Sequence, residues 1–220
     1  MENIFEALQW LMVPDTWSGP GGLAVRTVEH LWYTVLAVGA SVLIALPVGL
    51  LIGHTGRGRA LAVLSTGAAR ALPTLGLITL AALFTGIGLT APMLAFIVLA
   101  VPSIIAGAYS GVEAVDPRVV DAARAQGLSS WQVLLTVEVP LGLRLILGGI
   151  RLATLQVIAT AMLAAYVGAG GLGRPLFLGL RNYDYAMMLG ASIVVIVLAI
   201  IVDALFIAAQ RMLRRVPGIA

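Results

Sequence analysis

ALPTLGLITLAALFTGIGLTAPMLAFIVLAVPSIIAGAYSGV, residues 71–112, holds 42 residues without one charged side chain. As a single helix it would be about 63 Å long, because each residue adds about 1.5 Å. The hydrocarbon core of a bilayer is only about 30 Å thick, so the stretch predicts two membrane crossings joined by a turn. Gly86 and Gly88 favour that turn, and Pro92 suits the first turn of the helix that follows.

The composition places most of the surface in lipid. Of 220 residues, 60% are hydrophobic and 10% are charged, whereas about 25% of a soluble domain is charged. This excludes a soluble enzyme. The chain has no cysteine and no lysine, which excludes disulfides, thiolate metal sites, the lysine-dependent phosphate loop and Schiff-base chemistry. The net charge of +3 is too small and too scattered for a nucleic-acid surface, so no nucleic-acid partner is expected.

Three further uncharged runs each match one crossing. They are residues 31–53, residues 152–173 and residues 185–202, the last continuing past Asp203 toward Gln210. Together with the two crossings of the long stretch, they predict an all-α integral membrane protein with five transmembrane helices.

The second of these helices carries an arginine. Residues 71–84 alone are too short to cross, so the helix is expected to begin near Leu61, which places Arg70 inside it. A charge at mid-bilayer costs about 2.5 to 3.5 kcal/mol. Two interpretations stay open: Arg70 extends to the cytoplasmic headgroups, or it faces the interior of the bundle and a transport route.

Arginines are divided unequally between the two sides, with eight on one and three on the other. Basic residues are in excess on the cytoplasmic side, so the N-terminus is expected outside and the C-terminus in the cytoplasm. Residues 1–29 are expected to be extracytoplasmic, with no signal peptide and with an interfacial helix over residues 4–13. Residues 30–215 then form one transmembrane domain. The cytoplasmic set is Arg57, Arg59, Arg118, Arg124, Arg144, Arg211, Arg214 and Arg215, and the outer set is Arg26, Arg174 and Arg181.

The loop between helices three and four, residues 113–143, carries its own helix signals. Asp116 is a good N-cap and Pro117 suits the first helical position, so a short helix is expected over residues 118–126. Gly127 would end it in a left-handed conformation.

A second short helix is expected directly after the first. Ser129 and Gln132 form a capping box that starts it at about Trp131, and Pro140 is expected to stop it after Glu138. The small side chains of the first helix offer a smooth patch for another protein, but an ordinary interfacial hairpin fits the pattern equally well.

The string DAARAQGLSSWQVLLTVEVP, residues 121–140, resembles the EAA loop of ABC-transporter permeases. That loop has the pattern E-A-A, three residues, G, nine residues and I-x-L-P, and the spacing is intact here. Three positions depart conservatively, with Asp121 for Glu, Val137 for Ile and Val139 for Leu. The matching positions are Ala122, Ala123, Gly127 and Pro140.

Further segments are similar to binding-protein-dependent importers of the quaternary-amine osmoprotectants glycine betaine, choline and carnitine. The segments are VGAGGLG (167–173), GGIRLA (148–153), ALPTLGL (71–77) and VDPRVVDAA (115–123), and the resemblance covers residues 30 to about 205. That family usually carries Gln three residues before the proline of ALPTLGL, where this chain has Arg70. The departure does not affect the permease assignment, but it leaves the exact solute open.

The resemblance implies a type I ABC importer permease with a cytoplasmic coupling helix pair between helices three and four. It implies no catalytic residue and no cofactor in this chain, and two cytoplasmic ATP-binding subunits that use Mg-ATP. It further implies a second permease chain, identical or a sister, and an extracytoplasmic solute-binding protein. The expected location is a bacterial-type plasma membrane, surrounded by lipid, and the expected activity is osmoprotectant import by alternating access.

Roles for single residues follow from this resemblance. Ala122 and Ala123 would set how deeply the first short helix seats in the ATPase, and Gly127 would permit the sharp turn. Asp121 would pair with a basic residue of the partner or remain a solvated charge. Val137 and Pro140 complete the expected ATPase-coupling set.

Other residues are candidates for the translocation path or an outer gate. Polar side chains in the apolar runs either line the path or hydrogen-bond between helices: Arg70, Thr74, Ser103, Tyr109, Gln156, Thr160 and Tyr166. A glycine cluster that ends helix four is either a turn or an outer gate: Gly168, Gly170, Gly171 and Gly173.

Competing functions are a permease for a different small solute, a self-sufficient secondary transporter or channel, and a membrane enzyme. A secondary transporter usually shows internal repeats or ionisable residues at mid-membrane, for which Arg70 and Asp203 are candidates. An enzyme is disfavoured because His30 and His54 are expected at the two membrane interfaces, and the apolar runs hold no acidic partner for them except Asp203. No third ligand stands at a spacing suited to a metal site.

Overall fold

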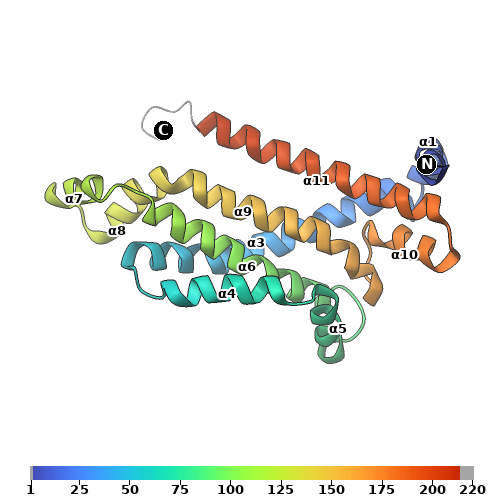
Figure 1. Cartoon of the computed structure of the whole chain (residues 1–220), viewed down its shortest axis with the longest axis horizontal. Helices are drawn as coiled ribbons and strands as arrows, with labels where there is room; N and C mark the ends of the chain where they lie inside the picture. Colours follow the sequence, from blue (N-terminus) through green and yellow to red (C-terminus); the bar gives the residue numbers. More distant parts are fainter. Residues whose placement is uncertain (1, 214–220) are drawn as a thin grey trace. The chain divides into compact units, whose positions relative to one another are not determined.

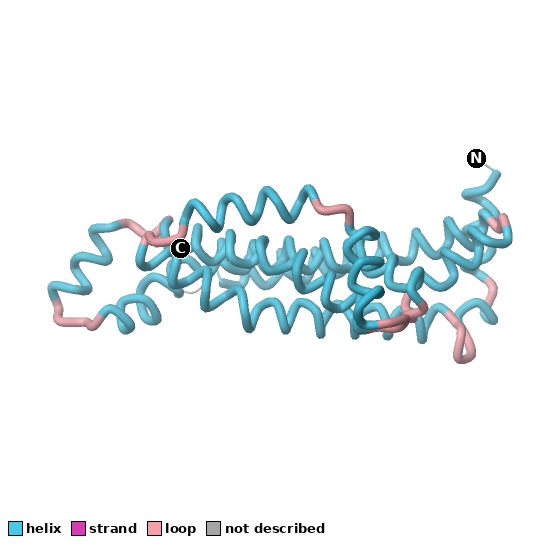
Figure 2. The backbone as a smooth tube through the Cα atoms, turned by 90° about the horizontal axis from the view of Figure 1, so that it is seen from below, coloured by secondary structure: helices cyan, strands magenta, loops and turns pink. Residues whose placement is uncertain are grey.

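A computed structural model describes residues 2–213, apart from the side chains of residues 2, 61, 65, 68–70 and 213. Within this part the regular elements are all helical and are joined by short loops (Figure 2). In chain order (Figure 1) they are α1 (Glu2–Met12), α2 (Pro14–Trp17), α3 (Leu23–Thr55), α4 (Arg59–Ala71), α5 (Thr74–Thr85), α6 (Thr90–Glu113), α7 (Pro117–Ala125), α8 (Ser130–Val133), the π-helical η1 (Leu134–Glu138), α9 (Val139–Ala161), the 3₁₀-helical η2 (Met162–Val167), α10 (Gly173–Asn182) and α11 (Tyr185–Leu213).

The chain divides into two compact units. Unit 1 consists of Met1–Val38, Leu72–Ile97 and Leu155–Val202. Unit 2 consists of Gly39–Ala71, Val98–Thr154 and Asp203–Ala220.

Unit 1 is organised around a cluster of large apolar side chains. Leu23, Ile158 and Leu172 are fully buried and pack with residues of α11. Trp10 and Leu11 of α1 pack against this cluster. The helix predicted near the N-terminus is therefore present, and its apolar face is attached to the unit.

Unit 2 is held together by close approach of helix backbones. A Cβ atom added at Gly107 of α6 would lie 2.8 Å from the backbone nitrogen of Gly149 in α9. One added at Gly49 of α3 would lie 2.8 Å from the carbonyl oxygen of Ile105 in α6. Glycine permits such contact, as it does between transmembrane helices in general. Within unit 2, α3, α6 and α9 therefore form a tightly packed set, and α6 and α9 run side by side (Figure 1).

Among the described residues, four helices are long and apolar enough to cross a membrane: Leu23–Thr55, Thr90–Glu113, Ser130–Val167 and Tyr185–Met212. The predicted turn between α5 and α6 is confirmed, since Gly86 and Gly88 have φ of +83° and +135°. The first helix begins at Leu23 rather than Leu31, because the charge of Arg26 is paired with Glu29 at 2.8 Å and does not end it.

The predicted second crossing is divided in two. α4 ends at Ala71, and Pro73, with φ −69° and ψ 112°, precedes the start of α5. Proline lacks an N–H group and disfavours a helical conformation at the residue before it, so the helix breaks there. α5 has 12 residues and a length of about 18 Å. Arg70 belongs to α4, and its side chain, like Arg214 and Arg215, lies outside the described part of the structure.

The predicted stop at Pro140 is wrong. The helical path continues from Ser130 to Val167, and Pro140 is the second residue of α9. The wider π-helical turn η1 comes directly before it, with the N–H of Val139 bonded to the carbonyl of Leu134. This turn accommodates the proline ring, which would clash with the carbonyl four residues earlier in an α-helix. The crossing predicted over residues 152–173 therefore belongs to a helix that begins far upstream, at Ser130.

Candidate functional site

α7 has well-defined ends, as predicted. At its start the Asp116 carboxylate accepts a hydrogen bond from the backbone N–H of Arg118 at 2.9 Å, and Pro117 is the first helical residue. At its end Gly127 has φ +88°, and its N–H donates to the carbonyl of Arg124 at 2.9 Å. These contacts form the short helix from local chemistry alone.

The second helix begins with the predicted capping box. The N–H of Ser129 donates to Gln132 Oε1 at 2.8 Å, and the N–H of Gln132 donates to Ser129 Oγ at 3.4 Å. We call α7, α8 and their caps, residues 116–133, the coupling hairpin. α7 contacts both α8 and η1, so the hairpin is supported by the start of the long helix that follows it.

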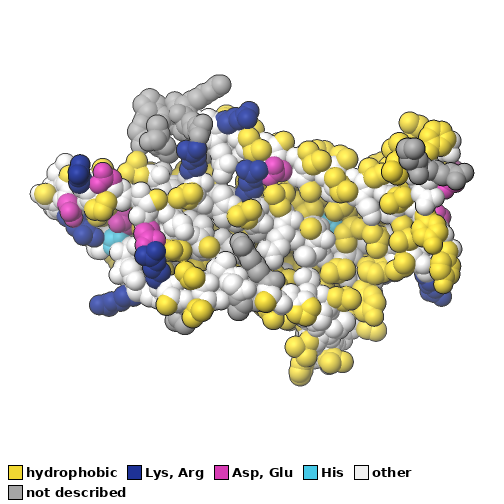
Figure 3. All heavy atoms as spheres, viewed as in Figure 1, with side chains coloured by type: hydrophobic (Ala, Val, Ile, Leu, Met, Phe, Trp, Pro, Cys, Tyr) yellow, Lys and Arg dark blue, Asp and Glu magenta, His cyan; other side chains and the backbone are white. Residues whose placement is uncertain are grey.

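The outer face of the hairpin is uncovered. None of the residues of α7 is buried: Asp121 and Ala122 are exposed and Ala123 is half-buried. Asp121 is 4.0 Å from Arg124, and both are exposed, so the pair contributes little. Basic and acidic side chains gather over this part of unit 2 (Figure 3). The expected ATPase-coupling residues of α7 therefore lie on an accessible, small-side-chain face.

A partly buried polar link joins the hairpin to α3. His54 Nδ1 lies 2.5 Å from Glu138 Oε2, and His54 Nε2 lies 2.6 Å from Ser130 Oγ. Glu138 is 4% exposed. One histidine thus connects the end of α3, the start of α8 and the end of η1. Val137 and Pro140 are half-buried beside this link.

The glycine cluster forms a tight turn packed on α3. Gly168 and Gly171 have φ of +88° and +80°, and the N–H of Gly171 donates to the Glu29 carboxylate at 2.8 Å. A Cβ atom at Gly170 would lie 2.8 Å from Tyr33 Oη, and Gly173 starts α10 against the Met162 carbonyl. The turn is therefore present, and its role as an outer gate stays a prediction.

The candidate path residues are divided between the two units. Thr74 and Thr160 belong to unit 1, whereas Ser103 and Tyr109 belong to unit 2. Thr160 Oγ1 donates to the Gln156 carbonyl of its own helix at 2.9 Å rather than across helices. Gln156 lies in unit 1, as does Tyr166, whose ring packs against Phe177 at 5.9 Å.

His30 is buried rather than interfacial. Its side chain is fully enclosed in unit 1, with Nε2 2.9 Å from the carbonyl oxygen of Ile158. The expectation was wrong because the crossing extends outward to Leu23. Among the described residues no group of histidine, aspartate and glutamate could hold a metal ion.

Comparison with known proteins agrees with this architecture. Residues 17–215 match the family model of binding-protein-dependent transport system inner membrane components. The carnitine transport permease protein OpuCB of Listeria monocytogenes is 33% identical, over 82% of this chain and 83% of that one. The osmoprotectant import permease protein OsmW of Salmonella typhimurium is 35% identical, over 83% of this chain and 87% of that one.

Solved structures show the same fold. A chain of the MetNI methionine ABC transporter, in an inward-facing conformation, superposes with a TM-score of 0.77 at 23% identity. The match covers 87% of this chain and 96% of that one. The fold is that of type I ABC importer permeases.

Proposed function

This chain belongs to the family of inner membrane components of binding-protein-dependent transport systems, and we propose that it is the permease subunit of an ATP-driven osmoprotectant importer. The solute would be a small quaternary amine of the betaine, carnitine and choline class. The support is that its relatives are named as permeases for carnitine and for osmoprotectants, at 33% and 35% identity over most of both chains.

The observation that supports the coupling role is that α7 is a well-formed helix that the described part of the chain leaves largely exposed. α7 is capped at both ends, yet none of its residues is buried. An exposed helix with alanines on its face is suited to enter a groove of another protein. We assign that groove to a cytoplasmic ATP-binding subunit, with Ala122 and Ala123 setting the depth of seating and Asp121 at the rim.

The packing of unit 2 explains how movement of α7 would reach the membrane helices. His54 ties α3 to Ser130 and Glu138 at the base of the hairpin, and glycine contacts bind α3, α6 and α9 to one another. A displacement of the hairpin is therefore carried by packed helices as a rigid body rather than absorbed by a loose loop. Closure of the ATPase on nucleotide would supply that displacement.

The partners in this proposal are two ATP-binding subunits, a second permease chain and an extracytoplasmic binding protein, with the N-terminus outside and the C-terminus in the cytoplasm. This chain itself would hydrolyse nothing. A self-sufficient ion-coupled carrier is less well supported, because Asp203 is held by Arg151 through two hydrogen bonds of 2.6 and 2.8 Å. That carboxylate is therefore not free to bind a coupling ion.

The test is glycine betaine uptake by cells that express the complete transporter with Ala123→Glu in this chain. A bulky charge on the seating face should abolish uptake and release the ATP-binding subunits from the purified complex. Ala114→Glu is the matched control, because Ala114 is exposed just before the hairpin, and it should retain both properties. Full uptake by Ala123→Glu would overturn the coupling assignment.

A further inference from the structure

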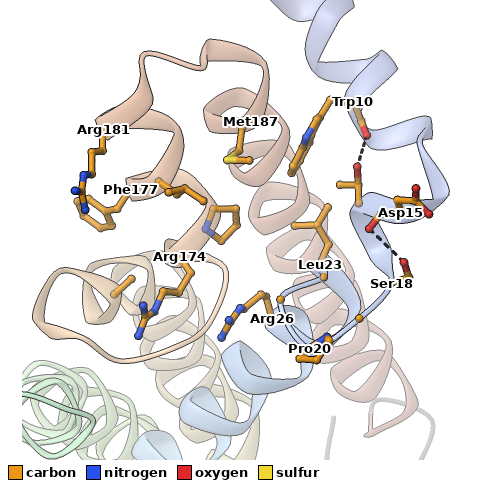
Figure 4. A pocket seen from close by; sticks show the side chains of 17 residues that line it. Trp10, Asp15, Ser18, Pro20, Leu23, Arg26, Arg174, Phe177, Arg181 and Met187 are labelled. Carbon is orange, nitrogen blue, oxygen red and sulfur yellow. Dashed lines mark hydrogen bonds between the residues drawn. The ribbon is translucent and has the colours of Figure 1, made fainter.

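Unit 1 contains a pocket of about 780 Å³ built from α1, the segment between α2 and α3, and α10. Ligand pockets in proteins commonly have volumes of about 300 to 1,000 Å³. Three arginines and one aspartate supply its charged groups, and Trp10, Phe177 and Met187 are among its apolar ones (Figure 4). Positive charge is thus in excess beside aromatic surface.

The arginines differ in how they are held. Arg26 is paired with Glu29 at 2.8 Å. Arg174 donates from Nε and Nη2 to the carbonyls of Ala169 and Gly168, both at 2.8 Å, which fixes its guanidinium. Its charge also attracts the carboxylate of Glu29, which therefore serves two arginines. Arg181 lies in the last turn of α10 and is exposed. For Arg181 the described part of the structure gives no ion-pair partner.

The indole ring of Trp10, on the α1 side of the pocket, is held in place by packing. Trp10 packs on the apolar cluster of unit 1, and a Cβ atom added at Gly190 of α11 would overlap its ring. Trp10 and Arg174 belong to different walls, contributed by α1 and α10 (Figure 4). The face of an indole attracts a quaternary ammonium group, and a guanidinium binds a carboxylate.

We propose that this pocket is a reception site for a zwitterion that carries both a carboxylate and a quaternary ammonium group. Arg174 and Arg181 receive the carboxylate, and Trp10 receives the ammonium group. The excess of positive charge disfavours a bare cation such as choline and selects solutes of the betaine and carnitine type. The inference rests on the proposed function and on the predicted outward position of the N-terminus.

Uptake of two labelled solutes by cells expressing the complete transporter tests this selectivity. Glycine betaine and choline share the quaternary ammonium group, and only the former has a carboxylate. Arg181→Gln should lower the ratio of glycine betaine uptake to choline uptake about tenfold or more, as expected for one charge-assisted hydrogen bond. Arg181→Lys should restore much of the ratio. Arg57→Gln, an exposed arginine of unit 2, should leave it unchanged.

A second variant separates solute binding from other roles. Trp10→Leu should lower uptake of both solutes, whereas Trp10→Phe should retain it, because phenylalanine keeps an aromatic face. If Arg181→Gln lowers both solutes equally, or neither, the arginine acts in docking or folding and the inference is wrong. If the unaltered transporter imports neither solute, it is the proposed function that fails.

Discussion

At the scale of single residues, His54 is the partner on which a buried carboxylate depends. Glu138 is 4% exposed, and an unpaired buried carboxylate is strongly destabilising. His54 Nδ1 at 2.5 Å satisfies it while Nε2 meets Ser130. The pair therefore fixes the base of the coupling hairpin as well as the end of α3.

Replacing His54 should destabilise the protein more than replacing Ser130. His54→Ala leaves Glu138 without its partner, and we expect a loss of about 3 kcal/mol in the free energy of unfolding. Ser130→Ala removes one hydrogen bond, with a loss of about 1 kcal/mol. Denaturant unfolding in detergent, followed by tryptophan fluorescence, measures both. Equal stability of His54→Ala and the unaltered chain would show that the pair is not stabilising.

At the scale of elements, two glycines without near neighbours differ in backbone conformation, so replacing them with alanine should have opposite effects on stability. An added Cβ at Gly127 or at Gly67 meets no atom within 4 Å, but only Gly127 has a positive φ, +88°. Gly127→Ala should therefore cost about 1 kcal/mol of local stability through backbone strain alone. Gly67→Ala, within α4, should gain up to about 1 kcal/mol.

Hydrogen–deuterium exchange checks this contrast. Exchange at the end of α7 should be faster in Gly127→Ala, and exchange in α4 should be slower in Gly67→Ala. If Gly127→Ala leaves exchange unchanged in both α7 and the start of α8, the turn does not need a residue in the left-handed conformation at this position. Osmoprotectant uptake should decrease only in the Gly127 variant, because only that change alters the hairpin.

Elements set by neighbouring residues could be predicted from the sequence. The caps at Asp116, Gly127 and Ser129 act within three residues, so their pattern identified α7 and the start of α8 correctly. The link from His54 to Glu138 spans 84 residues and leaves no periodic signal. The passage through Pro140 also depends on a π-helical turn that residue types alone do not specify.

The positions of charged residues also gave a wrong boundary for the first membrane helix. Ending a crossing at the nearest charge placed the first helix too late, since Arg26 and Glu29 neutralise each other inside it. The break at Pro73 was also missed, because the second helix was predicted to run from about Leu61 through this proline, whereas the structure ends α4 at Ala71 and starts α5 at Thr74. Only the three-dimensional structure brings Trp10 and Arg181 to one pocket.

At the scale of the whole molecule, the account depends on work supplied by another protein. The chain offers an exposed helix tied to tightly packed membrane helices, and its family consists of transport components that act with a binding protein. The proposed assembly predicts that α7 lies against an ATP-binding subunit during transport, and that this contact responds to nucleotide.

Site-specific cross-linking tests that claim most directly. The chain has no cysteine, so Ala123→Cys introduces its only thiol, and Ser18→Cys, in the exposed segment before α3, gives the matched control. In the complete transporter, a thiol-to-amine cross-linker should join Ala123→Cys to the ATP-binding subunit, with a yield that changes when ATP is added, and Ser18→Cys should give no such product. A transporter that imports solute at the full rate while Ala123→Cys never cross-links to its ATPase would contradict the account.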